Sequence, residues 1–328
     1  MAVLVTGGAG YIGSHTTIEL LERGEDVIVV DNLQTGHEKA VVGGTFYLGD
    51  IRDRSFLDRV FSQHEIEAVL HFAASSLVGE SVEQPLVYYE NNVIAAHTLL
   101  SVMLDHGVKC IVYSSTAATY GEPGQLPIRE ESATVPTNPY GETKLAVENM
   151  FRWCDRAYGL KSISLRYFNA AGAHPDGTIG EDHDPETHLI PIVMQAALGQ
   201  REKVHIFGDD YPTEDGTCIR DYIHVTDLAN AHWLALEHLR RHHRSGVYNL
   251  GNGRGFSVKE VIETVRDVTG QPIQADISPR RSGDPAILIA SPERAIRELN
   301  WKPKYDNLHT IVETAWKWHK AHPNGYGD

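Results

Sequence analysis

The amino-acid sequence predicts an α/β fold with a doubly wound parallel sheet and a smaller α/β substrate-binding lobe. One observation is the regular alternation of strand and helix patterns. Over residues 1–172, short β-branched runs alternate with longer segments of helical period, which is typical of parallel strands joined by helices. A second observation is where this alternation stops, at the long polar stretch AGAHPDGTIGEDHDPETH, residues 171–188. With 328 residues, of which 41% are hydrophobic, the chain can bury a substantial core in one domain or two.

The expected elements follow the chain in alternating order. Strands are expected at 2–6, 26–31, 45–48, 68–73, 110–115 and 162–168, and helices at 12–23, 55–64, 86–106 and 140–158. Six strands in this order indicate a Rossmann-type domain. Beyond the polar stretch, helical patterns at 189–199, 257–270 and 291–301 suggest the second lobe. We expect one domain over 1–172, onto which a segment near 218–240 packs back, and a lobe formed mainly by 173–328.

Charge and cysteine content narrow the function classes. The formal net charge of -15 and the pI near 5.6 oppose non-specific attraction to nucleic acid or to anionic membrane surfaces. Cys110, Cys154 and Cys218 are far apart and lack CxxC spacing, so neither a disulfide framework nor a zinc knuckle is indicated. MAVLVTGG leads straight into a strand pattern without a signal-peptide pattern, and no apolar run has membrane-spanning length. The cytoplasm is the simplest location.

A glycine-rich turn follows the first expected strand. In VLVTGGAGYIGSH, Gly7, Gly8, Gly10 and Gly13 lie between a strand and a helix. Glycine at these positions permits a tight turn and lets a pyrophosphate approach the helix N-terminus closely. A turn of this kind without a ligand is the alternative. The flanking strand and helix patterns favour a dinucleotide site.

Acidic residues end the second and third strands. Asp31 follows Gly13 at the distance where a carboxylate would bond a ribose 2′-hydroxyl and repel a 2′-phosphate. With Asn32 next and no Arg beside it, NAD is favoured over NADP. Asp50 could accept from the adenine amino group or cap the following helix. HFAAS (71–75) brings small residues to the fourth strand end, where a flat cofactor or a plain turn would fit.

The stretch NPYGETKL places Tyr140 four residues before Lys144, so on a helix both side chains share one face. Because a free tyrosine has a pKa of about 10, it becomes a useful base only beside a positive charge. A routine surface Tyr and Lys is the alternative. The fifth strand ends in Ser114, Ser115 and Thr116, whose hydroxyl groups could bond a substrate oxygen there, or form only a turn.

Taken together, these motifs resemble the extended short-chain dehydrogenase/reductase family. The likeness rests on TGGAGYIG, Asp31, SST and Tyr140-x-x-x-Lys144, and then on YYENNV, YFNAAGAH, IFGDDYPTEDGTCIRDYIHVTDLA, YNLGNGRGFSV and RRSGDPA in the same order. This string covers essentially the whole chain and is similar to the family's UDP-hexose 4-epimerases. The resemblance makes 1–172 the NAD-binding Rossmann domain and 173–328 mainly the UDP-sugar-binding lobe.

The resemblance implies reversible C4 epimerisation of UDP-glucose and UDP-galactose through a 4-keto intermediate and transient reduction of tightly bound NAD. Its implied catalytic residues are Tyr140 as base and acid on the sugar 4-hydroxyl, Lys144 as the group that tunes this phenol, and Thr116 as an assisting hydroxyl. Its implied cofactor residues are Gly7, Gly10, Tyr11, Ile12, Gly13, Asp31, Asn32, Asp50, Ile51, Phe72, Ala73, Ala74, Asn91, Ser114, Tyr140, Lys144 and Phe168. Its implied substrate residues are Thr116, Asn169, His188, Leu189, Phe207, Arg220, Tyr222, Arg281 and Asp284.

The family also implies a homodimer, in which helices near 86–106 and 140–158 would form a four-helix interface. Internal packing of these helices is the alternative. The chain departs from frequent family residues at Ser76, where many members have Lys, and at His188, where Asn is common. Leu288 is intermediate between the bulky and small residues associated with rejecting and accepting N-acetylated sugars, so UDP-GlcNAc stays open.

Other functions remain open beside this one. Epimerases of UDP-GlcNAc, UDP-glucuronate or UDP-pentoses fit the same motifs. A sugar-nucleotide 4,6-dehydratase is disfavoured because Ala117 and Ala118 follow Thr116, where related dehydratases have Asp-Glu. An NAD-sensing protein is disfavoured because Tyr140 and Lys144 are both present. No metal site is expected, because EDHDPETH and EHLRRHH lack a ligand spacing such as HExxH, and both are expected to be solvated.

Overall fold

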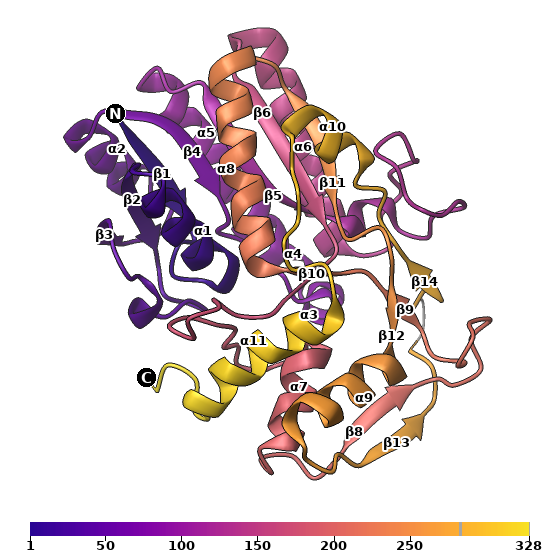
Figure 1. The fold of residues 1–328 in the computed structure, drawn as a ribbon. Coiled ribbons are helices and arrows are strands. Elements are labelled where there is room, and N and C mark those ends of the chain that lie inside the picture. The colour runs from indigo at the N-terminus through magenta and orange to yellow at the C-terminus, as the bar shows by residue number, and fades with distance from the viewer. Residues whose placement is uncertain (282–283, 328) are drawn as a thin grey trace.

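The computed structural model describes residues 1–281 and 284–327, and its largest unit is a seven-stranded parallel sheet (Figure 1). The strands are β1 Ala2–Thr6, β2 Asp26–Asp31, β3 Thr45–Leu48, β4 Ile66–His71, β5 Cys110–Thr116, β6 Lys161–Tyr167 and β11 Gly246–Leu250. They lie in the order β11-β6-β5-β4-β1-β2-β3, and every neighbouring pair is parallel. The order reverses between β1 and β4, which is where a doubly wound sheet opens a crevice for ligands.

Helices cover both faces of the sheet. They are α1 Tyr11–Glu22, α2 Arg54–Gln63, α5 Ala95–Asp105, α6 Pro139–Tyr158, α8 Val225–His242 and α10 Glu293–Leu299. Leu57 of α2, Leu99 of α5 and Phe151 of α6 belong to one buried cluster. Leu20 of α1 and Leu236 of α8 belong to a second. Helices on both faces of a parallel sheet confirm the predicted α/β fold.

The fully apolar sequence of β1 follows from this two-sided covering. Leu4 belongs to the first cluster, whereas Val3 and Val5 belong to the second. Successive strand residues point to opposite faces, so a strand buried on both sides needs apolar residues without alternation. All five residues of AVLVT are buried. The same reasoning explains the run VIVV in β2.

Several expected elements differ in the structure. The sheet contains a seventh strand, β11, which pairs with β6 and was not expected from the sequence. The expected strand 68–73 is instead β4, Ile66–His71, because the N–H groups of Phe72 and Ala73 both donate to Thr6 O as the backbone leaves the sheet. The expected helix 86–106 is divided into α4 Pro85–Tyr88, the π-helical segment η2 Tyr89–Ile94 and α5.

Residues 291–301 do not join the second lobe as expected. Ala295 and Leu299 of α10, with Trp301, lie in the second cluster of the large sheet. Trp301 Nε1 donates to Asp227 O at 3.0 Å, which ties this segment to α8. The division of the chain at residue 172 therefore stays a prediction. The later elements α8, β11 and α10 belong to the large sheet and not to the second lobe.

A smaller lobe packs around a third buried cluster, below the sheet in Figure 1. Its main elements are α7 Leu189–Ala197, α9 Val258–Thr269, α11 Leu308–Ala321 and the parallel pair β8 Val204–Phe207 and β13 Ala275–Ser278. Ser257 caps α9 by a capping box with Glu260. The remaining short elements are η1 Glu38–Ala40, α3 Val78–Glu83, η3 Ala117–Tyr120, β7 Asn169–Ala171, β9 Ile219–Arg220, β10 Tyr222–His224, β12 Phe256–Ser257 and β14 Ile287–Leu288.

Among the described residues, we find no helix with both the length and the apolar character needed to cross a membrane.

A buried ion pair fastens α6 to the sheet. Arg166 of β6 donates through Nε and Nη2 to both carboxylate oxygens of Glu148, at 3.0 and 2.5 Å, and both side chains are almost fully buried. Ser115 Oγ of β5 donates to the same Glu148 at 2.5 Å. Buried charges are costly unless every partner is present, so the three residues act as one unit.

Replacing Glu148 by Ala should lower the free energy of unfolding by about 3 to 5 kcal/mol, because Arg166 would be left buried without its partner. Denaturant unfolding would measure the loss. Glu263→Ala is the matched control, since its pair with Arg266 is largely exposed and should contribute less than about 1 kcal/mol. Equal effects of the two variants would contradict the prediction.

Candidate active site

One cavity of about 600 Å³ lies along the carboxyl ends of the parallel strands, at the crevice where the strand order reverses. It is lined by every residue implied for the cofactor: Gly7, Gly10, Tyr11, Ile12, Gly13, Asp31, Asn32, Asp50, Ile51, Phe72, Ala73, Ala74, Asn91, Ser114, Tyr140, Lys144 and Phe168. Thr116, Asn169 and His188 line it as well. The structure thus brings together residues from the carboxyl ends of six strands, β1 to β6.

The glycine turn at the start of α1 leaves backbone donors open to this cavity. Gly10 occupies the N-cap in an extended conformation, without a side-chain cap and without an acidic residue in the first turn. A Cβ on Gly13 would lie 2.1 Å from Gly7 O, and Gly7 itself has a φ of 75°. Only glycine fits these two positions. The first N–H groups of a helix lack intrahelical partners, so they can bind a pyrophosphate.

Asp31 lies at the end of β2 and is nearly buried. Its Oδ2 accepts from Ala9 N at 3.0 Å and its Oδ1 accepts from Leu33 N at 2.8 Å. Burial raises the pKa of this carboxyl above its ordinary value, while these N–H groups oppose the rise. Two backbone bonds fix the direction of the carboxylate in the cavity, where lone pairs remain for a ribose hydroxyl.

Asp50 does not cap the helix that follows it, so the capping alternative was wrong. The N-cap of α2 is Asp53, which accepts from the N–H groups of Ser55 and Phe56. Asp50 instead accepts from Arg52 Nη2 at 2.7 Å and from Asn32 Nδ2 at 3.1 Å. Its hydrogen bond with Arg52 is the main reason that its pKa falls to about 2.

Tyr140 and Lys144 both face the cavity from the first two turns of α6. Asn138 begins this helix by accepting from Gly141 N at 2.9 Å. Lys144 is 2% exposed, and its Nζ donates to Ser114 O at 2.9 Å. The same Nζ lies 5.9 Å from the ring centroid of Tyr140. Lys144 is therefore close enough to act on the phenol by its charge, without a direct hydrogen bond to it.

Burial acts against both ionised forms of this pair. It lowers the pKa of Lys144 to about 7, while the Glu148 carboxylate opposes the fall. It raises the pKa of Tyr140, while a hydrogen bond from Thr116 favours the phenolate. The phenol therefore stays protonated unless further positive charge enters the cavity. An oxidised nicotinamide ring would bring such charge.

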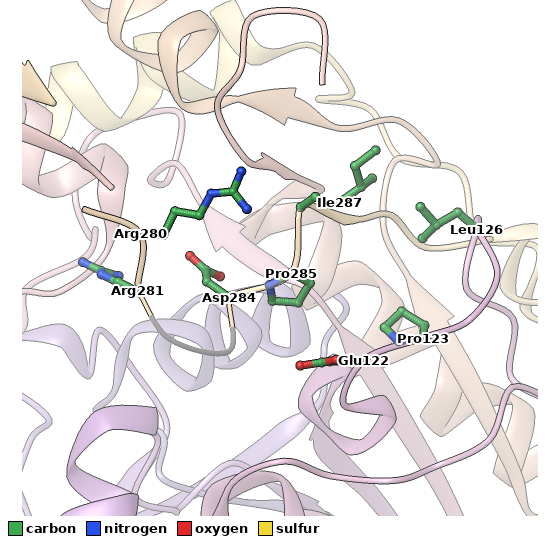
Figure 2. Close-up of a pocket in the computed structure, with 9 residues that line it drawn as sticks. Glu122, Pro123, Leu126, Arg280, Arg281, Asp284, Pro285 and Ile287 are labelled. Atoms are coloured by element: carbon green, nitrogen blue, oxygen red, sulfur yellow. The ribbon is translucent and has the colours of Figure 1, made fainter. Parts of the chain in front are cut away.

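Two of the residues implied for the UDP part lie at a second cavity, of about 520 Å³ (Figure 2). Arg281 and Asp284 line it together with Arg280, and Glu122 and Pro123 line it from another segment. Residues 282–283 of RRSGDPA lie outside the described residues.

Side-chain contacts extend this group to two further candidates. Asp284 forms an ion pair with Arg220 of β9. The Arg281 guanidinium lies 4.0 Å from the ring centroid of Phe207. Tyr222 lies in the third buried cluster and Leu189 at its edge, and neither residue lines one of the two cavities.

Sequence reasoning missed several residues that line the first cavity. Arg52 donates to Asn91 Oδ1 at 2.9 Å as well as to Asp50, which places a cation beside Asp50 in the cavity. Its position two residues after a strand-end Asp is a signal that could have indicated it. Tyr167 hydrogen-bonds Ser114 through their hydroxyl groups, and it directly precedes Phe168. His183 joins the cavity from the loop 171–188, where no local pattern marked it.

This combination of sheet, glycine turn, strand-end acid and Tyr/Lys helix defines a dinucleotide-dependent enzyme that exchanges a proton with its substrate. The chain belongs to the NAD dependent epimerase/dehydratase family, whose sequence profile matches residues 3–251.

Several proteins of high similarity carry the name UDP-glucose 4-epimerase. A UDP-glucose 4-epimerase of Halalkalibacterium halodurans is 70% identical over 326 residues, which cover 99% of this chain and 98% of that protein. A crystal structure of a UDP-glucose 4-epimerase has 58% identity and a TM-score of 0.98, over 99% of each chain. The enzyme of Bifidobacterium longum, solved in complex with NAD+ and UDP, has 43% identity and a TM-score of 0.94, over 99% of this chain and 100% of that one.

Gly13→Ala should weaken NAD binding by about tenfold to a hundredfold. The added Cβ would force the turn to shift, and overpacking of this kind costs about 1 to 3 kcal/mol. NAD content after gel filtration and titration of the stripped protein would measure the loss. Gly124→Ala is the control, because nothing lies within 4 Å of the added atom there. Unchanged NAD binding in Gly13→Ala would contradict the assignment of the glycine turn as the pyrophosphate site.

Proposed function

We propose that this chain catalyses the reversible C4 epimerisation of UDP-glucose and UDP-galactose, with NAD as its tightly held cofactor. The observation that carries the proposal is one cavity in which the glycine turn, Asp31 and the pair Tyr140 and Lys144 face the same space. The UDP-glucose 4-epimerases similar to this chain support the substrate, and the one solved with NAD+ and UDP supports both ligands.

The residues of the first cavity fit NAD. The open N–H groups of α1 would hold its pyrophosphate, Asp31 its adenosine ribose, and Lys144 its nicotinamide ribose. When bound, NAD supplies reversible hydride acceptance at the sugar C4. Phe72 and Ala73 come within 3 Å of where a Gly7 Cβ would be, so the backbone there lies close against the turn.

Tyr140 moves the proton of the sugar 4-hydroxyl. Its phenolate oxygen accepts this proton as the sugar is oxidised to the 4-keto form, and the resulting phenol returns the proton to O4 when the other face of the sugar is presented. Thr116 supplies a hydroxyl beside Tyr140 and is itself positioned by the N–H of Ala118 at 3.1 Å. Lys144 supports the phenolate by its charge.

Arg220 and Arg281 would hold the diphosphate of the substrate, and Phe207 would flank the uracil. A guanidinium group binds phosphate oxygens in a bidentate manner, and these two are local positive charges in a chain of net charge -15. Asp284 already orients Arg220, so the fork is held before a ligand arrives.

The exposed apolar residues of α3, α4, η2 and α6 form a surface suited to a second copy of the chain. Leu86 is 80% exposed and Trp153 is 59% exposed, and Val82 and Ile94 are exposed on elements that contact α6. Large exposed apolar side chains that gather on neighbouring elements mark interaction sites. We expect light scattering to give twice the chain mass of 36.4 kDa, and Ile94→Asp to give the monomer mass. A monomer mass for the unaltered protein would contradict the homodimer.

The cytoplasmic location stays a prediction.

The function is tested by incubating the purified protein with UDP-galactose and no added NAD. Chromatography should show the approach to a stable mixture of UDP-galactose and UDP-glucose. Appearance of a 4-keto-6-deoxy sugar would indicate a dehydratase instead. No conversion, even with NAD supplied, would overturn the assignment.

Tyr140→Phe should lower kcat by about a hundredfold to ten thousandfold while NAD stays bound, because the variant loses the group that exchanges the proton. Tyr158→Phe is the matched control, since Tyr158 lies exposed at the other end of the same helix. An NAD-sensing protein would behave alike in both variants. Full activity of Tyr140→Phe would remove Tyr140 from the mechanism.

A further inference from the structure

The loop between β7 and α7 gathers two histidines and two glutamates in one place. Glu181, His183, Glu186 and His188 each offer one nitrogen or oxygen atom, and these atoms all lie within 4.8 Å of one another. The sequence reading that EDHDPETH is solvated was wrong for the two glutamates, whose side chains are only 4% and 5% exposed. Its residues are not at helical spacing, and a compact loop brings them together instead.

The two imidazole rings point the same nitrogen at the same oxygen. Nδ1 of His188 lies 2.7 Å and Nδ1 of His183 lies 3.2 Å from Oε1 of Glu181. Glu186 completes the group, with Oε1 3.3 Å from His188 Nδ1 and Oε2 3.7 Å from His183 Nδ1. Among the described residues, Glu181 Oε1 and His183 Nδ1 make no hydrogen bond of acceptable geometry despite being buried. The atoms converge on a shared region without forming directed pairs.

Contacts outside the group hold this loop in place. Glu186 Oε1 accepts from the N–H groups of Thr187 and His188, both at 2.7 Å. Trp318 Nε1 of α11 donates to Glu181 O at 3.2 Å. Supporting bonds of this kind fix the direction of ligand groups around metal ions.

We propose that Glu181, His183, Glu186 and His188 bind one divalent transition-metal ion, for which Zn²⁺ is the best fit. Two imidazole nitrogens and two carboxylate oxygens form a four-ligand set that suits Zn²⁺, whereas Mg²⁺ and Ca²⁺ prefer oxygen alone. Bonds of about 2.0 to 2.2 Å around a tetrahedral ion put ligand atoms roughly 3.3 to 3.6 Å apart. The His–Glu separations of 2.7 to 3.7 Å lie near this range, and the widest separation in the group, within 4.8 Å, would have to shorten by about 1 Å. A dication balances the two carboxylates with both rings neutral.

The position of the group gives such an ion a structural consequence. Glu181, His183 and His188 line the first cavity, and the ring centroid of His183 lies 6.2 Å from that of Tyr11, the first residue of α1. An ion here would fasten the loop 171–188 beside the helix start assigned to the NAD pyrophosphate. His188 is also among the residues implied for the substrate, so the ion would lie at the edge of that site, but its binding can be measured without any sugar substrate.

The test uses NAD-containing protein without a histidine tag, stripped by dialysis against a chelator and titrated with Zn²⁺ in competition with a chromophoric chelator. We expect about one ion per chain, and visible absorption of four-coordinate Co²⁺ in a parallel titration. His183→Asn and Glu186→Gln should each weaken Zn²⁺ binding by at least about tenfold. Far-UV circular dichroism and NAD content report whether each variant is folded.

The control variant is His242→Asn. His238 and His242 of α8 have ring centroids 4.5 Å apart, so they are a second place where Zn²⁺ could bind without the loop. Binding lost in His242→Asn and kept in His183→Asn would overturn the proposal. Binding well below one ion per unaltered chain would also overturn it, whatever the variants do, and would identify the group as an ion-pair cluster. If a loop variant fails to fold, the Zn²⁺ stoichiometry of the unaltered chain and of His242→Asn decides.

Discussion

The inner face of α6 and its attachment to β5 determine the active site. Lys144 and Glu148 lie one helical turn apart and are both buried, Lys144 on Ser114 O and Glu148 on Ser115 Oγ. Since consecutive residues of β5 hold consecutive turns of α6, the helix can neither slide nor rotate on the sheet. Tyr140, one turn before Lys144, is thereby fixed at the cavity. Arg166 neutralises Glu148 and so offsets the free-energy cost of burying its carboxylate.

This attachment also determines the electrostatics of the reaction. The burial that fixes the geometry lowers the pKa of Lys144 and raises that of Tyr140, so the pair on its own favours the neutral phenol. Thr116 and Glu148 oppose these effects in part. In the proposed reaction, Tyr140 is an effective base only when the positively charged nicotinamide ring lies in the cavity, so the protein would be inactive without NAD. The attachment of α6 to β5 thus supplies the position of the base and the cofactor supplies the positive charge, and the proposed reaction needs both.

Local patterns predicted the parts of the molecule that depend on short stretches of chain. The glycine turn, Asp31 at the end of β2 and the i, i+4 pair of α6 each follow from a few adjacent residues and one strand or helix period. The places of β11 and α10 on the large sheet could not be predicted in this way, because a local pattern does not say which sheet a strand or helix joins. The grouping of Glu181 with His188 likewise depends on a loop without a period, fixed by Trp318 from a distant helix. The long helix expected over 86–106 is interrupted at η2, because the sequence YENNVI carries no local pattern that distinguishes π-helical from α-helical bonding.

The late return of β11 and α10 to the sheet bears on how the chain is made. β6 ends at Tyr167, but the strand that covers its outer edge begins at Gly246, and Trp301 completes the cluster on one face. During synthesis the first six strands therefore emerge with an unpaired edge and a bare apolar face, which are the features that promote aggregation. The native sheet can close only after nearly the whole chain has left the ribosome. A fragment ending at residue 172 would keep the binding motifs and lack the surfaces that make them stable.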